Sequence, residues 1–408
     1  MNKFNYKKNQ LVTLIGKNGG DIFKFAGDAL LVIWPESSEG DQLSLCRRAI
    51  QCAIDIQNKV SINFASLSVK IGIGIGNFKI AFVGGQFDRC EYLVIGEGMK
   101  QACISETRAS KGGEIIVSQE VHALVNGFVE LEECKDESAH EPSDDPSEEK
   151  YYKIKKNEIK IRVPTRADAF IMRTKFNHEK LRDNNAILKR FVPAAITLHL
   201  DIEQEFWSKE LRMISVMFLN LGINLKNTES KEGMQRVQRI VKTCQRCIYR
   251  TRGSLNKFLM DDKGSVMLVC WGLPPLSATD DHLRAVLTGF DLIQELKQLD
   301  CYAYIGISTG SAFSGVCGTI GNRKEYSLLS EVVNLSARNM QKAIEISKKK
   351  KPADNYNILM CKRTADVNLL IIFIIFYKFI FIKFFQILLK IIFNFESLFQ
   401  IKYRVFVE

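Results

Sequence analysis

The stretch Gly20-Asp-Ile-Phe-Lys-Phe-Ala-Gly-Asp-Ala-Leu-Leu-Val-Ile-Trp34 returns as Gly253-Ser-Leu-Asn-Lys-Phe-Leu-Met-Asp, running on to Val-Met-Leu-Val-Cys-Trp271. Each stretch consists of two apolar runs separated by a short turn, which predicts a β-hairpin. Because the glycine, the lysine-phenylalanine pair and the tryptophan all recur in order, the chain contains a duplicated unit.

A second repeated block follows each hairpin. Lys70-Ile-Gly-Ile-Gly-Ile-Gly76 matches Tyr304-Ile-Gly-Ile-Ser-Thr-Gly310, and each block leads to a Glu-Tyr pair. The step from Gly76 to Tyr92 and the step from Gly310 to Tyr326 are both 16 residues. Chance rarely keeps such a register over two blocks.

The remaining hydrophobic periodicity indicates an α+β fold rather than the strict alternation of a doubly wound sheet. Helices are expected at Leu43–Val60, His282–Leu299 and Val332–Ile344, and further strands at Val69–Ile75, Lys150–Val163, Leu211–Leu221 and Ala303–Ile307.

Composition changes suggest the domain boundaries. We expect a first domain at 1–165 with an acidic insertion at 130–149, a connector at 166–205, a second domain at 206–365 and a Phe/Ile-rich tail at 366–408. The longest uncharged stretch of the tail, Val367 to Tyr377, is shorter than the roughly 20 residues that a membrane helix needs. The tail therefore stays open to three interpretations: membrane contact, a structured part of the core, or a non-native or disordered extension.

The bulk composition limits the partners. A net charge of +11 suits an anionic partner such as a nucleotide. No block of Lys and Arg interleaved with aromatics occurs, so nucleic acid is not expected. Eleven cysteines without an even framework, and no secretory signal, favour a reducing, cytoplasmic setting. The single Cys-x-x-Cys of Cys244 and Cys247 has no second pair or nearby histidine, and we do not expect zinc there.

Three motifs carry a resemblance to a known family. Phe25-Ala-Gly-Asp-Ala-Leu30, Tyr92-Leu-Val-Ile-Gly96 and Asn334-Leu-Ser-Ala-Arg338 resemble signatures of class III nucleotidyl cyclases, nearest to the soluble, bicarbonate-responsive adenylyl cyclase type. The resemblance implies two ferredoxin-like domains that form an intramolecular pseudo-heterodimer around one nucleotide. It also implies conversion of ATP to 3′,5′-cyclic AMP and pyrophosphate with two Mg²⁺ or Mn²⁺ ions, in intracellular signalling.

The resemblance gives roles to individual residues. It implies that Asp28 is a metal carboxylate, that Lys70 contacts the terminal phosphates, that Asn334 orients the ribose and that Arg338 stabilises charge on the α-phosphate. Taken alone, Asp28 is an ordinary turn aspartate. Asn334 and Arg338, four residues apart, would be an ordinary solvent-facing helix stripe.

Base recognition falls by resemblance on Lys257 and Ser327. Guanylyl cyclases place a glutamate at the lysine position, so a lysine donor favours ATP. Asn220 stands where the second domain could have carried a metal aspartate, which predicts no metal in that domain.

A second, degenerate pocket binds bicarbonate in the soluble cyclase type. Its lining matches Lys24, Val94 and Met260, and an arginine of that pocket falls on Cys103. Because Cys103 lacks the positive charge, the resemblance predicts only weak bicarbonate binding. Lys24 could equally be a strand lysine that pairs with a neighbour.

One departure from the family pattern concerns the metal site. Only 27 residues precede Asp28, so we expect the first domain to lack its first strand and helix, as in an N-terminally truncated chain, together with the second metal carboxylate. Little cyclase activity is then expected of the chain as given. The alternatives are a catalytically silent nucleotide-binding homologue with a regulatory or scaffold role, and a membrane-anchored signalling protein.

Overall fold

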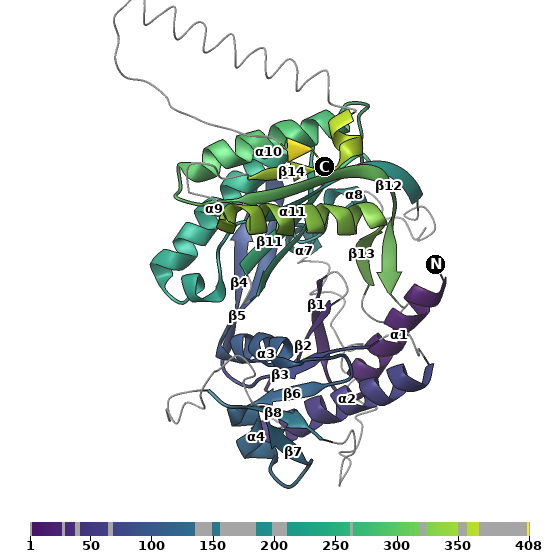
Figure 1. Ribbon diagram of the computed structural model, residues 1–408, viewed down its shortest axis with the longest axis vertical. Coiled ribbons are helices and arrows are strands. Elements are labelled where there is room, and N and C mark those ends of the chain that lie inside the picture. The colour runs from purple at the N-terminus through teal and green to yellow at the C-terminus, as the bar shows by residue number, and fades with distance from the viewer. Residues whose placement is uncertain are drawn as a thin grey trace, which may run out of the picture.

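The computed structural model describes residues 2–26, 29–36, 41–63, 68–134, 149–155, 185–197, 210–261, 264–318, 324–349, 357–366 and 406–407. We call residues 2–155 the first half and residues 210–407 the second half. The first half lies at the bottom of Figure 1 and the second at the top. The short helices α7 (Asn185–Lys189) and α8 (Ala194–Thr197) come between the halves in the chain, and α8 packs on the sheet of the second half through Ala195 and Ile196.

The second half is built on a seven-stranded sheet of strand order β10-β11-β9-β12-β14-β15, in which β13 pairs with β12. Strand β9 is antiparallel to both β11 and β12, and therefore lies in the middle of the sheet. In chain order the elements are β9 (Glu210–Asn220), η3 (Leu225–Thr228), α9 (Lys231–Arg250), β10 (Ser254–Asp261), β11 (Gly264–Trp271), α10 (Asp281–Lys297), β12 (Tyr304–Gly318), β13 (Lys324–Leu329), α11 (Glu331–Lys349), β14 (Ile358–Met360) and β15 (Phe406–Val407).

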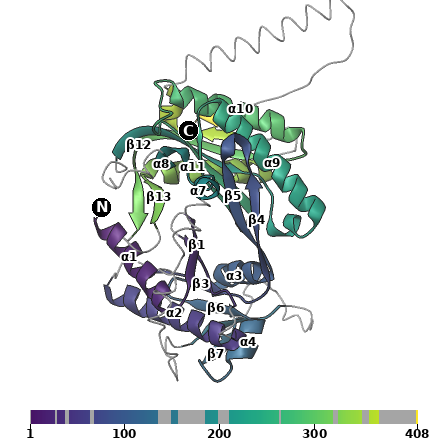
Figure 2. The ribbon, with the colours of Figure 1, turned by 180° about the vertical axis from the view of Figure 1, so that it is seen from behind.

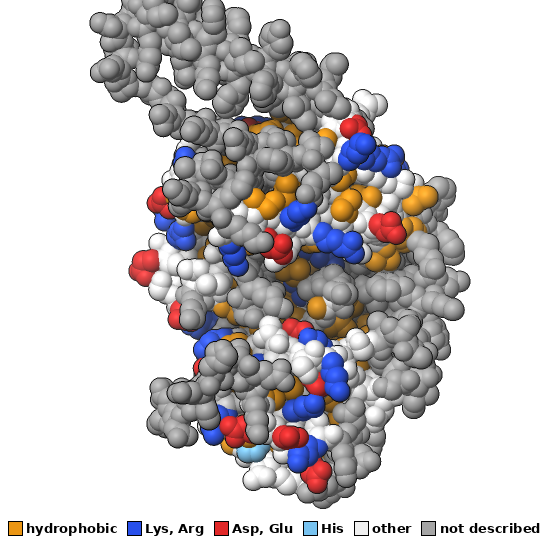
Figure 3. All heavy atoms as spheres, in the orientation of Figure 1, with side chains coloured by type: hydrophobic (Ala, Val, Ile, Leu, Met, Phe, Trp, Pro, Cys, Tyr) orange, Lys and Arg blue, Asp and Glu red, His pale blue; other side chains and the backbone are white. Residues whose placement is uncertain are grey.

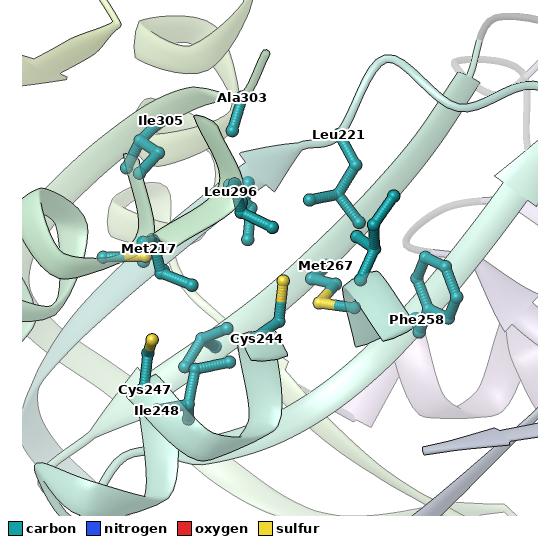
Figure 4. Packing of buried hydrophobic residues seen from close by; sticks show 14 of the residues in the cluster. Met217, Leu221, Cys244, Cys247, Ile248, Phe258, Met267, Leu296, Ala303 and Ile305 are labelled. Carbon is teal, nitrogen blue, oxygen red and sulfur yellow. The ribbon is translucent and has the colours of Figure 1, made fainter. Parts of the chain in front are cut away.

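Helices α9 and α10 cover one face of this sheet. Ser230 begins α9 by accepting the Gly233 N–H at 2.9 Å. The helix then buries residues at three- and four-residue spacing, and Cys244, Cys247 and Ile248 lie against Met217 of β9 and Met267 of β11 (Figure 4). Both cysteines of the Cys-x-x-Cys pair are thus apolar core residues, and burial raises the pKa of Cys247 to about 11.

The first half has similar elements but three separate sheets: β1 with β2, β4 with β5, and a four-stranded sheet of order β3-β6-β8-β7. Within its described residues, no strand joins β2 to β3 as β9 joins β11 to β12. The elements are α1 (Asn2–Lys17), β1 (Asp21–Ala26), β2 (Ala29–Ile33), α2 (Gln42–Asn63), β3 (Ile71–Ile73), β4 (Phe78–Gly84), η1 (Gln86–Asp88), β5 (Cys90–Gly96), α3 (Glu97–Arg108), β6 (Ile115–Ser118), α4 (Gln119–Val125), β7 (Leu131–Glu133) and β8 (Tyr151–Ile154).

The structure corrects one expectation about the first half. A helix does precede its first hairpin: α1 packs on β1 and α2 through Val12 and Ile15, as α9 packs beside β10 and α10.

The predicted hairpins, helices and α+β content are otherwise confirmed. Both hairpins even share an irregularity, because the β1–β2 register shifts between Ile22 and Lys24 and the β10–β11 register between Leu255 and Lys257. Residues 135–148 of the acidic insertion, residue Asp28 and the tail at 367–405 lie outside the described residues. Among the described helices, none has the length and apolar character required to cross a membrane.

The repeated glycine and tryptophan of the hairpins are in direct contact. A Cβ added to Gly253 would lie 2.7 Å from the ring of Trp271, which is fully buried. In the first half, a Cβ on Gly20 would likewise lie 2.7 Å from Trp34. Glycine is required at both positions because the tryptophan ring lies where a side chain would begin.

We therefore expect Gly253→Ala to lower the free energy of unfolding by about 1–3 kcal/mol, the usual effect of overpacking a core. Gly16→Ala in α1 is the control, since no atom lies within 4 Å of the added methyl group. Urea denaturation followed by circular dichroism measures both variants. Equal losses in the two proteins would show that the contact with Trp271 is unimportant.

Candidate functional site

The two halves meet along the β4–β5 hairpin, which extends from the first half to α9 of the second half (Figures 1 and 2). The amide of Gln238 on α9 both donates to the Gly84 carbonyl at 3.0 Å and accepts from the Gly84 N–H at 2.7 Å. Val83, Leu93 and Ile95 of the hairpin belong to the same apolar core as α9 and α10. This contact fixes the hairpin on the second half.

Two lysines at repeated positions cross between the halves. Lys24 of β1 donates to the Phe258 carbonyl of β10 at 2.6 Å, and Lys257 of β10 donates to the Phe25 carbonyl of β1 at 3.2 Å. Each lysine thus reaches the carbonyl of the residue that follows the other lysine. Both are largely buried, with 8% and 9% of their surface exposed. We call these four residues, together with Glu91, the lysine junction.

Lys24 also has charged and aromatic partners in its own half. Its ammonium lies 3.2 Å from a carboxylate oxygen of Glu91, donates to the Tyr92 carbonyl and lies 4.5 Å from the centre of the Tyr92 ring. The other oxygen of Glu91 accepts from Arg89 at 2.5 Å. A buried carboxylate therefore lies between two cations, as buried charges require.

This arrangement gives no support to the expected bicarbonate site. Val94 lies on β5 and Met260 on β10, two strands in contact with each other, and Cys103 belongs to α3, which contacts both strands. However, Glu91 supplies the negative charge that faces Lys24, so bicarbonate binding is not supported. The interpretation of Lys24 as a strand lysine paired with a neighbour is the one that the structure favours.

The expected base-reading residues lie in the second half. Lys257 belongs to the lysine junction, directly after the bulge of β10. Ser327 lies on β13 opposite Gly315 of β12 and is 4% exposed. Asn220 ends β9, and its side-chain oxygen accepts the Gly222 N–H at 2.8 Å in a turn.

The helix α11 presents Asn334 and Arg338 to solvent because the residue between them holds the opposite side. Ser336 is fully buried; it donates to the Gly306 carbonyl at 2.7 Å and the Val216 carbonyl at 3.0 Å, and accepts from the Phe218 N–H. Gly306 permits this approach, since an added Cβ would lie 2.1 Å from the Ser336 carbonyl. The helix is therefore pressed against β9 and β12, and its outer side is exposed.

Two of the expected site residues are not placed at a nucleotide site. Lys70 is exposed and donates to the Ala109 carbonyl at 2.6 Å, just after the C-terminus of α3, where a cation is favourable. Its contact with phosphates stays a prediction. Asp28 lies outside the described residues, so its metal role also stays a prediction.

The described residues do not provide a metal site. Among them, no group of three or more His, Cys, Asp and Glu side chains is placed to hold a metal ion. On the face drawn in Figure 3, basic and acidic side chains are interspersed over both halves rather than gathered by sign.

Comparison with known proteins relates this geometry to a fold. No family model matches the chain. A class III adenylyl cyclase-like ATP-binding protein from Pseudomonas aeruginosa has a TM-score of 0.50 at 12% identity, covering 88% of this chain and 76% of that one. A bacterial light-regulated adenylyl cyclase gives 0.38 at 21% identity, over 48% of this chain and 57% of that one. The chain has the class III nucleotidyl cyclase fold.

Curated sequences give a distant likeness to particular proteins. The chain is 26% identical over 365 residues to adenylate cyclase type 10 of Oryctolagus cuniculus, and 25% identical over 366 residues to that of Homo sapiens. Each match covers 82% of this chain but 21% of the relative. The chain thus spans about a fifth of the length of the curated relatives that it matches.

Sequence reasoning missed the residues that hold the site together. In the sequence, Glu91 stands out only as part of the repeated Glu-Tyr pair, and Ser336 only as a residue between Asn334 and Arg338. A charged residue inside the apolar strand Cys90–Gly96 was the available signal for Glu91, because an unpaired carboxylate there would be costly.

We expect Ser336→Ala to lower the free energy of unfolding by about 1–3 kcal/mol, because buried polar groups lose their partner. Arg338→Ala, on the exposed side of the same helix, should change stability by less than about 0.5 kcal/mol. Urea titration of both variants tests this division between an inner and an outer side of α11. A larger loss for Arg338→Ala would contradict it.

Proposed function

We propose that the two halves form a pseudo-heterodimer that binds ATP between them and converts it to cyclic AMP and pyrophosphate. The reciprocal contacts of Lys24 and Lys257 carry the proposal, because they join the two halves at equivalent positions within a class III cyclase fold. The distant likeness to adenylate cyclase type 10 supports the choice of reaction.

Lys257 would select the base. An ammonium group can only donate hydrogen bonds. The N1 atom of adenine is an acceptor, whereas the N1 atom of guanine carries a hydrogen. A lysine at this position therefore favours adenine, and the hydroxyl of Ser327 would complete the contact because it can both donate and accept.

Asn334 and Arg338 would act on the ribose and the α-phosphate. In the proposed reaction the ribose 3′-oxygen forms a bond to the α-phosphorus, and the bond from that phosphorus to the bridging oxygen of pyrophosphate breaks. Negative charge increases on the phosphoryl oxygens, and a fixed guanidinium stabilises such charge. The hydrogen-bonded Ser336 would keep both residues in place.

The metal requirement of this reaction is not met by the described residues, so we derive no step through metal ions. Asp28 remains the proposed metal ligand from the sequence. The domain boundaries at 1–165 and 206–365 are likewise part of the proposal.

A second candidate is an ATP-binding protein without turnover. One observation favours it: the solved structure with the TM-score of 0.50 is that of a class III adenylyl cyclase-like ATP-binding protein. In the second half, Asn220 ends β9 at the position where the family resemblance would place a metal aspartate. Binding and turnover must therefore be measured separately.

Calorimetry should show that the chain prefers ATP to GTP. Lys257→Gln, which keeps a donor, should reduce ATP affinity modestly, and Lys257→Glu should reduce it about ten- to a hundredfold, because a donor becomes an acceptor. Circular dichroism checks that both variants fold. A wild type that binds GTP more tightly would refute the assignment of Lys257.

Turnover is tested by following cyclic AMP formation from ATP in the presence of Mn²⁺. If the chain is active, Arg338→Ala should lower kcat much more than it raises KM, because the contact strengthens in the transition state. ATP binding with no cyclic AMP would instead support the second candidate. The absence of both would reject the proposed function.

A further inference from the structure

The buried carboxylate of Glu91 has no role in the functions considered so far. It is 3% exposed, it lies within the β4–β5 hairpin, and both of its oxygens are ion-paired. One oxygen faces Arg89 of the same strand region, and the other faces Lys24 of β1. Its effect on the nucleotide site depends on how firmly each of these two cations is held.

Arg89 is the fixed end of this chain of contacts. Its guanidinium also donates to the carbonyls of Cys90 at 2.6 Å and Arg190 at 3.1 Å, and its own carbonyl accepts from Gln245 of α9 at 2.8 Å. The residue is therefore attached to its own strand, to the segment before α8 and to the second half. Glu91 transmits that fixed position to Lys24.

Lys24 is the adjustable end. A lysine side chain is flexible, and its buried ammonium would lose its counter-charge without Glu91. With Glu91 in place, the ammonium lies between the carboxylate and the Phe258 carbonyl, at 3.2 Å and 2.6 Å. Phe258 follows Lys257 in β10, so whatever holds Phe258 also sets the position of Lys257.

We propose that Glu91 is a positioning residue for the nucleotide site: it holds Lys24 on the Phe258 carbonyl and thereby aligns β10, with Lys257, against β1. The carboxylate acts as a built-in anion at the lysine junction, so this alignment requires no small anion from solution. The proposal rests on the proposed function only where it refers to nucleotide; the alignment of β1 and β10 can be measured without any ligand.

The first measurement is hydrogen exchange on the full chain without nucleotide. Glu91→Gln should raise the exchange rate about tenfold or more in peptides from Ser254–Asp261, because the loss of a charge-assisted contact lowers protection by about that factor. Glu114→Gln is the matched control. Glu114 is also a buried carboxylate of the first half, but it pairs with Lys153 at 2.6 Å and with Ser110, away from the second half. It should raise exchange near β6 and β8 and leave β10 unchanged.

The second measurement separates positioning from simple charge balance. The double variant Glu91→Gln with Lys24→Met removes the carboxylate together with the cation that contacts the second half, and circular dichroism checks that it folds. If Glu91 only balanced charge, the double variant would regain wild-type protection in β10 and wild-type ATP affinity. Such recovery would overturn the proposal. Continued fast exchange in β10, with ATP affinity lowered about tenfold or more, supports it.

Formate provides the third measurement. Glu91→Ala leaves a carboxylate-sized space between Lys24 and Arg89, and formate should restore β10 protection there, with chloride as the control. Wild-type protein should not respond to formate or bicarbonate. If the wild type binds no ATP while Glu91→Gln still loosens β10, the proposed function fails and the positioning role stands. Unchanged exchange in β10 would refute the positioning role, whatever the protein binds.

Discussion

Burying two ammonium groups at one contact is the constraint on which the arrangement of the halves depends. A buried charge is tolerated only where polar groups replace the lost water. Here each lysine donates to a carbonyl of the opposite half. The strands β1 and β10 must therefore lie together, and the β4–β5 hairpin must bring Glu91 to the same place.

Different elements hold the two hairpins in place. In the second half, β9 hydrogen-bonds to β11 and β12 and makes a continuous sheet. In the first half, the hairpin β1–β2 is held by α1, α2 and the contact with β10 instead. The first hairpin thus depends on the second half for part of its stability, so changes at the lysine junction should affect β1 more than the core beneath α9 and α10.

Much of the fold could be predicted from the sequence because its signals are local. The hairpins, α2, α10 and α11 follow from apolar spacing. Gly253 and Gly306 stand out as repeated residues, and the structure explains them by their close contacts with Trp271 and Ser336. The partners of Lys24 could not be predicted, because Glu91 is 67 residues away and Phe258 is 234 away. The contact between Lys70 and the end of α3, 39 residues away, could not be predicted from the sequence either.

The roles of the site residues divide between a rigid and an adjustable element. Asn334 and Arg338 are on a helix whose inner side is fixed by Ser336 against the two central strands β9 and β12. Lys257 is on an edge strand whose alignment also depends on Lys24 and Glu91 from the first half. If a nucleotide contacts both elements, its affinity reports how well the halves are aligned. We infer that the base end of the site is sensitive to the contact between halves, because Lys257 is held by residues from both.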